Sequence, residues 1–275
     1  MGESHLELIQ PEDWTRPNAP SRNRAPLFLM HDGGGTTFMY NFLPALGRFV
    51  YGIRNPHFST GEIFSGGVSE MGRLYARWIH DTVARTSFPA RRNPNEDKGV
   101  DIILGGWSFG GLLSLEVAKQ LDNYTGVRVV GILAVDSIYP SEAATAAPTP
   151  PPPGSASDGD GREKTRNQVL SERAMEEARC MVRMWTVPVW EGPESRRPRV
   201  VLLKAKGYIP STSGSVSPLD LDRGPGGRLG WDQHDEAMFE EVIEVEGHHF
   251  ELFSGGRIEG TGRAMRQALD ELDTP

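Results

Sequence analysis

Short apolar runs alternate with helix-like segments along most of this chain, and this alternation restricts the fold more than any other feature of the sequence. Between the runs, apolar residues recur every three or four positions, as they do on one face of a helix. Continuous apolar strands separated by helices are typical of a parallel sheet that is covered on both faces, so we predict an α/β fold. The predicted strands are 26–30, 49–53, 101–104, 129–135, 200–203 and 242–245, and the predicted helices lie within 71–83, 112–121, 169–185 and 265–272.

The N-terminus and one internal stretch depart from this pattern. Residues 1–25 are polar and contain prolines, and we predict a flexible arm there, followed by a single domain over residues 26–275. Residues 143–166 read AATAAPTPPPPGSASDGDGREKTR and show no apolar periodicity. Such a composition cannot bury enough apolar surface to offset the entropy lost on ordering, so we predict that this stretch is disordered.

The net charge of −8 and the single cysteine argue against several classes of protein. An acidic chain is not suited to nucleic acid or to an anionic membrane as its main partner. No run approaches the ~18 apolar residues of a membrane span, and the first 20 residues do not resemble a signal peptide. Cys180 alone allows neither an internal disulfide nor a cysteine-based zinc site. We therefore expect a cytoplasmic protein.

The segment LGGWSFGGL, residues 104–112, is the most informative motif in the sequence. It consists of a strand end, a Gly-x-Ser-x-Gly pattern and the start of a helix. Glycines flank a nucleophile on a tight strand-to-helix turn because larger side chains would collide with the turn. Gly-x-Ser-x-Gly alone is a weak pattern in a chain with 32 glycines, but here the flanking strand and helix are also predicted. We predict that Ser108 is a nucleophile.

A nucleophilic serine also needs backbone donors for the oxyanion that forms on its substrate. HDGGG, residues 31–35, follows the first predicted strand, where an oxyanion-hole loop is expected. We assign the donors to the amides of Gly33 and Phe109, with Gly34 as a possible substitute for Gly33. A glycine turn that serves packing alone is the alternative.

Several aspartates are candidates for the acid of a catalytic triad, which on this type of fold follows the serine and precedes the histidine. Asp136 comes directly after the predicted strand 129–135. The other candidates lie in a charged loop after strand 200–203. For all of them the alternative is a solvated surface carboxylate. These later candidates are Asp220, Asp222, Asp232 and Asp235.

Two adjacent histidines, His248 and His249, follow the last predicted strand in the stretch GHHFELF. Adjacent side chains on an extended backbone point in opposite directions, so only one of them can face Ser108. Composition and alternation do not choose between the two.

GWSFGG, AVDSIYP and GHHFELF together resemble the thioesterase domains that release products from polyketide and nonribosomal peptide synthases. HDGGGTTFMYNFLPAL and VYGIRNP resemble the fungal members in particular. The resemblance extends from about residue 26 to the C-terminus. It implies an α/β-hydrolase fold with a mostly parallel central sheet, helices on both faces, and a helical lid inserted at about residues 141–195. The long Pro/Gly/Ser-rich stretch within that lid departs from the family.

The resemblance also implies roles for individual residues. In the family, the acid follows the strand after the nucleophile helix, which corresponds to Asp136. The C-terminal signature has the form Gly-x-His followed by an apolar pair, which Gly247, His249 and the pair Leu252-Phe253 fit. His249 is therefore expected to be the base, and His248 a neighbour that points elsewhere.

The function that the resemblance implies is acyl transfer from a thioester. Ser108 takes a polyketide-like or peptide-like acyl chain from the phosphopantetheine arm of an acyl carrier protein or peptidyl carrier protein, and releases it by hydrolysis or cyclisation. No cofactor or metal is expected. A carboxylesterase or lipase on the same fold is one alternative, and a non-catalytic binding member of the fold is another.

Overall fold

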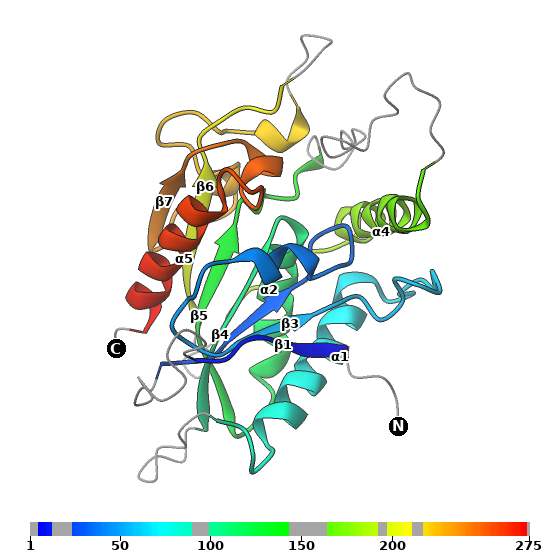
Figure 1. The fold of residues 1–275 in the computed structure, drawn as a ribbon, viewed down its shortest axis with the longest axis vertical. Helices are drawn as coiled ribbons and strands as arrows, with labels where there is room; N and C mark the ends of the chain where they lie inside the picture. The colour runs from blue at the N-terminus through cyan, green and yellow to red at the C-terminus, as the bar shows by residue number, and fades with distance from the viewer. Residues whose placement is uncertain are drawn as a thin grey trace.

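The computed structural model describes residues 5–12, 24–89, 99–142, 164–191, 197–210 and 217–273. These residues form a seven-stranded sheet in the order β1-β3-β2-β4-β5-β6-β7, with helices on both faces (Figure 1). All neighbouring strands are parallel except β1 and β3. The predicted α/β fold with a mostly parallel sheet is confirmed. The strands are β1 (Leu6–Gln10), β2 (Leu27–Met30), β3 (Val50–Ile53), β4 (Val100–Trp107), β5 (Val127–Val135), β6 (Arg199–Ala205) and β7 (Glu241–Val245), and the helices are α1 (Gly67–Val83), α2 (Phe109–Leu121), α4 (Arg166–Arg183) and α5 (Ile258–Leu272).

Two separate apolar cores hold the helices against the sheet, because successive side chains of a strand point to opposite faces. In β2, Phe28 and Met30 belong to the core that α1 and α2 cover, whereas Leu27 and Leu29 belong to the core that α5 covers. All four side chains are fully buried. The continuous apolar runs of the sequence are therefore strands that bury both of their faces.

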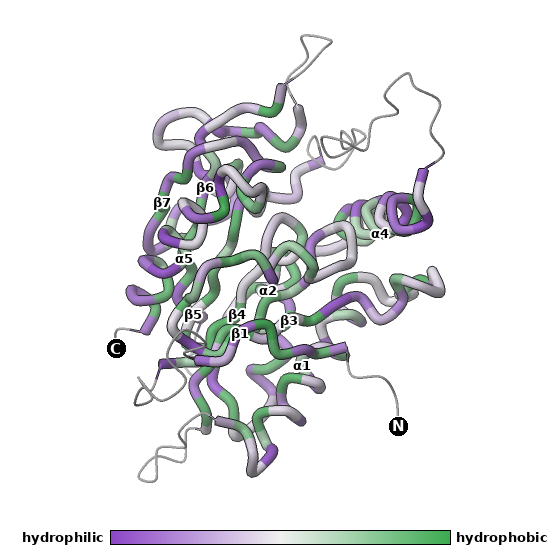
Figure 2. The backbone as a smooth tube through the Cα atoms, viewed as in Figure 1, coloured by the Kyte–Doolittle hydropathy of each residue, from purple (hydrophilic) through white to green (hydrophobic). Residues whose placement is uncertain are grey.

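The outer helices are amphipathic, as their apolar periodicity predicts. In α5, Met265 and Leu269 are buried, whereas Arg263 and Asp270 are exposed. Figure 2 shows the same contrast, with the central strands mainly hydrophobic and α5 alternating between polar and apolar residues. Within the described residues, none of the helices combines the length and apolar character that a membrane crossing requires.

The prediction of a flexible arm over residues 1–25 is wrong for Leu6–Gln10, which forms β1 at the edge of the sheet. This strand pairs antiparallel with β3. Its last side chain, Gln10, is buried, donates to the carbonyl of Leu43 at 2.9 Å and accepts from the amide of Leu46 at 3.0 Å. Because an edge strand has one neighbour and leaves much of its surface exposed, its residues need not be apolar, and the sequence pattern is weak.

The helix α4 lies between β5 and β6 along the chain, within the range expected for the lid, and packs against α1. Thr165 caps its first turn: the Thr165 side chain accepts from the amide of Gln168, and the Gln168 side chain accepts from the amide of Thr165. Most of the stretch 143–166, which is predicted to be disordered, lies outside the described residues, up to residue 163. The prediction extends too far at its end, because α4 is already helical at Arg166.

Candidate active site

Ser108 occupies the turn between β4 and α2 in a conformation that residues other than glycine seldom adopt, with φ 57° and ψ −117°. Backbone strain of this kind costs about 1–3 kcal/mol and persists where the surrounding structure enforces it. Its amide donates to the carbonyl of Val135 at 2.8 Å, and its carbonyl accepts from the amide of Gly111 at 3.1 Å and the hydroxyl of Ser137 at 2.8 Å. The turn therefore holds Ser108 firmly at the carboxyl edge of the sheet.

The two glycines of the motif are required by close backbone contacts. A Cβ atom on Gly106 would lie 2.6 Å from the carbonyl carbon of Gly110, and one on Gly110 would lie 2.7 Å from the carbonyl oxygen of Met30. Contacts this short do not occur between real atoms. The Gly-x-Ser-x-Gly pattern thus has the steric origin that the sequence motif predicts.

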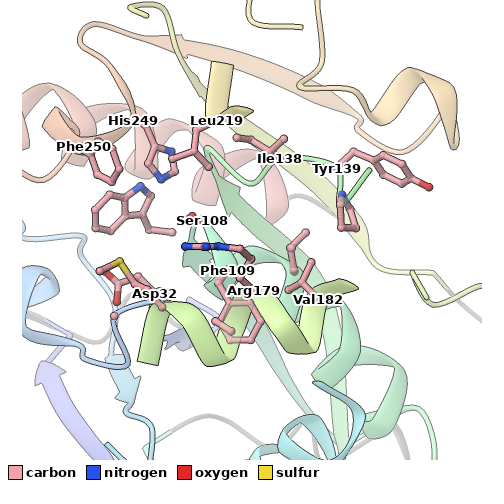
Figure 3. A pocket seen from close by; sticks show the side chains of 17 residues that line it. Asp32, Ser108, Phe109, Ile138, Tyr139, Arg179, Val182, Leu219, His249 and Phe250 are labelled. Carbon is pink, nitrogen blue, oxygen red and sulfur yellow. The ribbon is translucent and has the colours of Figure 1, made fainter. Parts of the chain in front are cut away.

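Asp136 and His249 lie within hydrogen-bonding distance of each other. Asp136 follows β5, is fully buried, and accepts a hydrogen bond from His249 Nδ1 at its Oδ2 atom over 2.8 Å. Because an ionised carboxylate only accepts, His249 carries a proton on Nδ1 in this bond, and its Nε2 atom is the basic nitrogen. His249 and Ser108 line the same pocket, and Figure 3 shows the imidazole next to Ser108.

His248, the other histidine of the pair, has a structural contact instead. Its Nδ1 atom accepts a hydrogen bond from the amide of Phe250 at 3.3 Å, and the amide of His248 donates to the Glu251 carboxylate at 3.2 Å. These two bonds cap the short 3₁₀ helix His249–Glu251. His248 does not line the pocket that contains Ser108.

The later aspartates all make other contacts in the described part of the chain. Asp220 binds the guanidinium of Arg223 at 2.9 Å, and Asp222 accepts from the amide of Arg228 at 2.9 Å. Asp232 lies 3.6 Å from Arg228, and Asp235 pairs with Arg197. Asp136 is the carboxylate that the structure brings to His249.

A buried arginine that sequence reasoning did not identify completes this arrangement. Arg223 holds both oxygens of Asp136, at 2.8 and 2.9 Å, and its Nε atom donates to Asp220 at 2.9 Å. Burial raises the pKa of Asp136, but the hydrogen bonds from His249 and Arg223 outweigh this effect and hold the pKa below its ordinary value. Asp136 therefore stays ionised while it orients the imidazole.

Removing this guanidinium is expected to destabilise the fold and to alter the pH dependence of activity. In Arg223→Met, two buried carboxylates lose their cation, a change that costs about 3–5 kcal/mol and is measurable as the free energy of unfolding in urea. Without the guanidinium, the pKa of Asp136 loses one of the two interactions that hold it below its ordinary value, so Asp136 should become protonated at higher pH and the acidic limb of the kcat/KM profile should move to higher pH. Arg223→Lys keeps the charge but not the bidentate contact with Asp136, so the loss of stability and the shift of the pH profile should both be smaller.

Arg228→Met is the matched control, because Arg228 lies in the same loop but its contacts, an ion pair with Asp232 and a hydrogen bond to the carbonyl of Glu236, are partly exposed. Its loss is expected to cost less than about 1 kcal/mol and to leave the pH profile in place. Equal stability and equal pH profiles for Arg223→Met and Arg228→Met would contradict the role given to Arg223.

The residues predicted for the oxyanion hole lie in the wall of the same pocket. Gly33, Gly34 and Phe109 all line it, and it encloses about 160 Å³. The amide of Gly34 faces the carboxyl group of Asp32, which favours Gly33 and Phe109 as the groups directed at a substrate oxygen. The remaining wall comes from the end of β4, α2, the loop after β5, α4, and the segments that follow β6 and β7.

Comparisons with known proteins agree with this fold. Residues 27–252 match the family model described as alpha/beta hydrolase family. The chain is 31% identical over 262 residues to the probable thioesterase BOA10 of Botryotinia fuckeliana, covering 93% of this chain and 89% of that protein. It is also 28% identical over 276 residues to the nonribosomal peptide synthetase imqB of Aspergillus flavus, covering 90% of this chain but only 8% of that protein.

Among solved structures, the NocB thioesterase domain from the nocardicin cluster has a similar fold. The TM-score is 0.64 at 23% sequence identity, and the match covers 98% of this chain and 100% of that chain. The chain therefore belongs to the alpha/beta hydrolase family and, within this family of hydrolytic enzymes, to the thioesterases.

Proposed function

We propose that this protein is a serine thioesterase in which Ser108 is the nucleophile, His249 the base and Asp136 the acid of a catalytic triad. The 2.8 Å hydrogen bond between His249 Nδ1 and Asp136 Oδ2 carries the proposal, because it leaves the basic Nε2 nitrogen for the serine in the same pocket. The strained backbone at Ser108 supports the role of nucleophile.

In the first half of the reaction, His249 Nε2 takes the proton of the Ser108 hydroxyl. At the same time the Ser108 Oγ atom bonds to the thioester carbonyl carbon. The negative charge that develops on the carbonyl oxygen is stabilised by the amides of Gly33 and Phe109, with Gly34 as the substitute donor, and by the N-terminus of α2. The C–S bond then breaks, its electron pair leaves with sulfur, and the imidazolium gives the sulfur its proton. An acyl ester of Ser108 remains.

In the second half, His249 removes a proton from the acceptor that attacks this ester. The acceptor is water in hydrolysis, or a hydroxyl or amine of the acyl chain itself in cyclisation. Asp136 stays ionised throughout and stabilises the protonated ring. None of these steps draws on a cofactor or a metal.

The proposed donor of the acyl chain is the phosphopantetheine thioester of an acyl carrier protein or peptidyl carrier protein. The similarity to an 8% portion of the synthetase imqB supports this partner. The same similarity supports a peptide-like acyl chain, and the resemblance of the sequence motifs to synthase thioesterase domains supports a polyketide-like one.

A comparison of thioesters with oxygen esters tests the proposal. The protein is mixed with an acyl-N-acetylcysteamine thioester and with the ethyl ester of the same acid, and turnover and the mass of the intact protein are recorded. We expect faster turnover of the thioester and a mass increase equal to the acyl group. Faster turnover of the oxygen ester would indicate a carboxylesterase, and turnover of neither compound would indicate a non-catalytic member of the fold.

A further inference from the structure

The hydroxyl of Tyr40 connects the ends of two neighbouring strands of the sheet, β2 and β4. It donates to the carbonyl of Met30, the last residue of β2, at 2.8 Å, and accepts from the amide of Trp107, the last residue of β4, at 3.0 Å. Tyr40 lies in the short 3₁₀ helix Phe38–Phe42, is only 2% exposed and does not line the Ser108 pocket. The phenol therefore reaches the pocket only through the two strand ends.

The hydroxyl takes the place of a direct hydrogen bond between the two strands. The amide of Ile103 donates to the carbonyl of Pro26 at 2.9 Å, and the paired register of β2 and β4 continues without a shift up to Met30. Hydrogen bonds of a parallel pair are evenly spaced along the strands, so the same register would join the amide of Trp107 directly to the carbonyl of Met30. Tyr40 is inserted between these two groups, and the strand ends are spread apart by one hydroxyl group.

The two spread ends carry the two halves of the proposed oxyanion hole. The loop that contains Gly33 begins directly after β2, and the turn that leads to Phe109 begins directly after β4. The first turn of α2 also contacts the carbonyl that Tyr40 binds, since a Cβ atom on Gly110 would lie 2.7 Å from the carbonyl oxygen of Met30. The separation of β2 and β4 at this edge therefore sets the separation of the two amides that would receive a substrate oxygen.

The phenol is itself held in place by its surroundings. The amide of Tyr40 donates to the carbonyl of Thr37 at 3.0 Å, and its ring packs edge-on against Phe253, with the ring centroids 5.5 Å apart. Phe253 also contacts the ring of Trp107, at 5.3 Å between centroids. Burial raises the pKa of Tyr40, and the nearby charge of Asp32 raises it further. The phenol therefore keeps its proton and can donate and accept at the same time.

We infer that Tyr40 is a positioning residue for the oxyanion hole, and that its hydroxyl holds β2 and β4 at the separation at which the amides of Gly33 and Phe109 both reach the thioester carbonyl oxygen. The inference rests on the proposed function and adds to it a residue that does not line the pocket. Without the hydroxyl, the amide of Trp107 and the carbonyl of Met30 can pair directly at about 2.9 Å. Direct pairing draws the strand ends together and misaligns the two donors.

Tyr40→Phe tests the inference, because it removes this hydroxyl and keeps the ring. The full chain is assayed with the N-acetylcysteamine thioester of hexanoic acid, and kcat, KM and the pH dependence of kcat/KM are compared with those of the unmodified protein. Loss of one whole oxyanion-hole donor lowers kcat by about 10²–10³-fold, and here both donors are displaced but neither is removed. We expect kcat to fall by about 10- to 100-fold with KM within about twofold, since an oxyanion hole acts on the transition state. The pH profile should stay in place, because the phenol carries no charge.

Two further variants separate positioning from structural support. Tyr51→Phe makes the same chemical change at a buried tyrosine of β3 that does not line the pocket, and its kcat should equal that of the unmodified protein. Tyr40→para-aminophenylalanine returns to the same position a group that can donate and accept, and it should recover most of the lost kcat. Thermal unfolding of each variant measures how much of any loss is a loss of folded protein.

A kcat of Tyr40→Phe within about twofold of the unmodified value overturns the inference. A loss that Tyr51→Phe shares, that the amino variant does not recover, that is confined to KM, that moves the pH profile or that only matches the unfolded fraction also overturns it. If neither variant of Tyr40 folds, the phenol is required for the fold rather than for the reaction, and the inference is wrong. If the unmodified protein turns over no thioester, the proposed function itself is wrong, and this inference falls with it.

Discussion

Replacing Ser108 with alanine is expected to abolish turnover and covalent labelling of the protein. The variant lacks the oxygen that bonds to the acyl carbon in the first half of the proposed mechanism. In a serine protease, loss of the nucleophile lowers kcat by about 10⁶-fold, and we expect a loss of the same order in single-turnover acylation. Labelling by a fluorophosphonate, detected as the mass of the intact protein, measures the same loss independently of any substrate.

Ser114→Ala is the matched control for this experiment. Ser114 lies on α2, is fully buried, and donates its hydroxyl to the carbonyl of Gly110 at 2.7 Å, but it does not line the pocket. Its removal is expected to cost about 1 kcal/mol of stability while the protein still reacts with the fluorophosphonate. Labelling of Ser108→Ala at the level of the unmodified protein would contradict the assignment of the nucleophile.

The second large effect is expected to separate the two adjacent histidines. His249→Gln removes the group that accepts the proton of Ser108, and it should lower single-turnover acylation by about 10⁶-fold, as loss of the base does in a serine protease. His248→Gln keeps a side chain that can accept from the amide of Phe250, so acylation should change by less than about tenfold. The glutamine variants are compared in the same acylation assay, with thermal unfolding as a check on the fold.

An inactive His248 variant beside an active His249 variant would contradict the assignment of the base. It would also conflict with the hydrogen bond between His249 and Asp136, which is the contact that distinguishes the two rings in the structure. Equal losses in both variants, with equal losses in thermal stability, would indicate that the loop rather than one imidazole is required.

Much of the fold could be predicted from the sequence because the deciding interactions are local. Strands that bury both faces, such as Val200–Leu203 within β6, must be continuously apolar, and helices that cover a sheet must repeat apolar residues every three to four positions. The serine turn is local in the same sense, since Gly106 and Gly110 are needed within two residues of Ser108. Each of these features leaves its pattern in a short segment.

Other features could not be read in this way, because they depend on which distant segments meet. The strand β1 is short, partly exposed and paired only with β3, so Leu6–Gln10 shows no pattern that separates it from a polar arm. Arg223 is one of many arginines in the sequence, and nothing near it indicates burial. Its role arises because the loop after β6 folds back onto the end of β5, where Asp136 lies.

The sequence by itself determined the layered α/β architecture, the position of the serine turn and the short list of acids and histidines that could serve it. Alternating strands and helices, together with glycine sterics, are sufficient for these conclusions. Only the tertiary structure decided which acid and which histidine meet, since Asp136 and His249 are 113 residues apart and their 2.8 Å contact depends on the parallel order of β5, β6 and β7. The carboxyl ends of parallel strands lie at one edge of a sheet, and that common edge brings these distant residues together with Ser108 and Arg223.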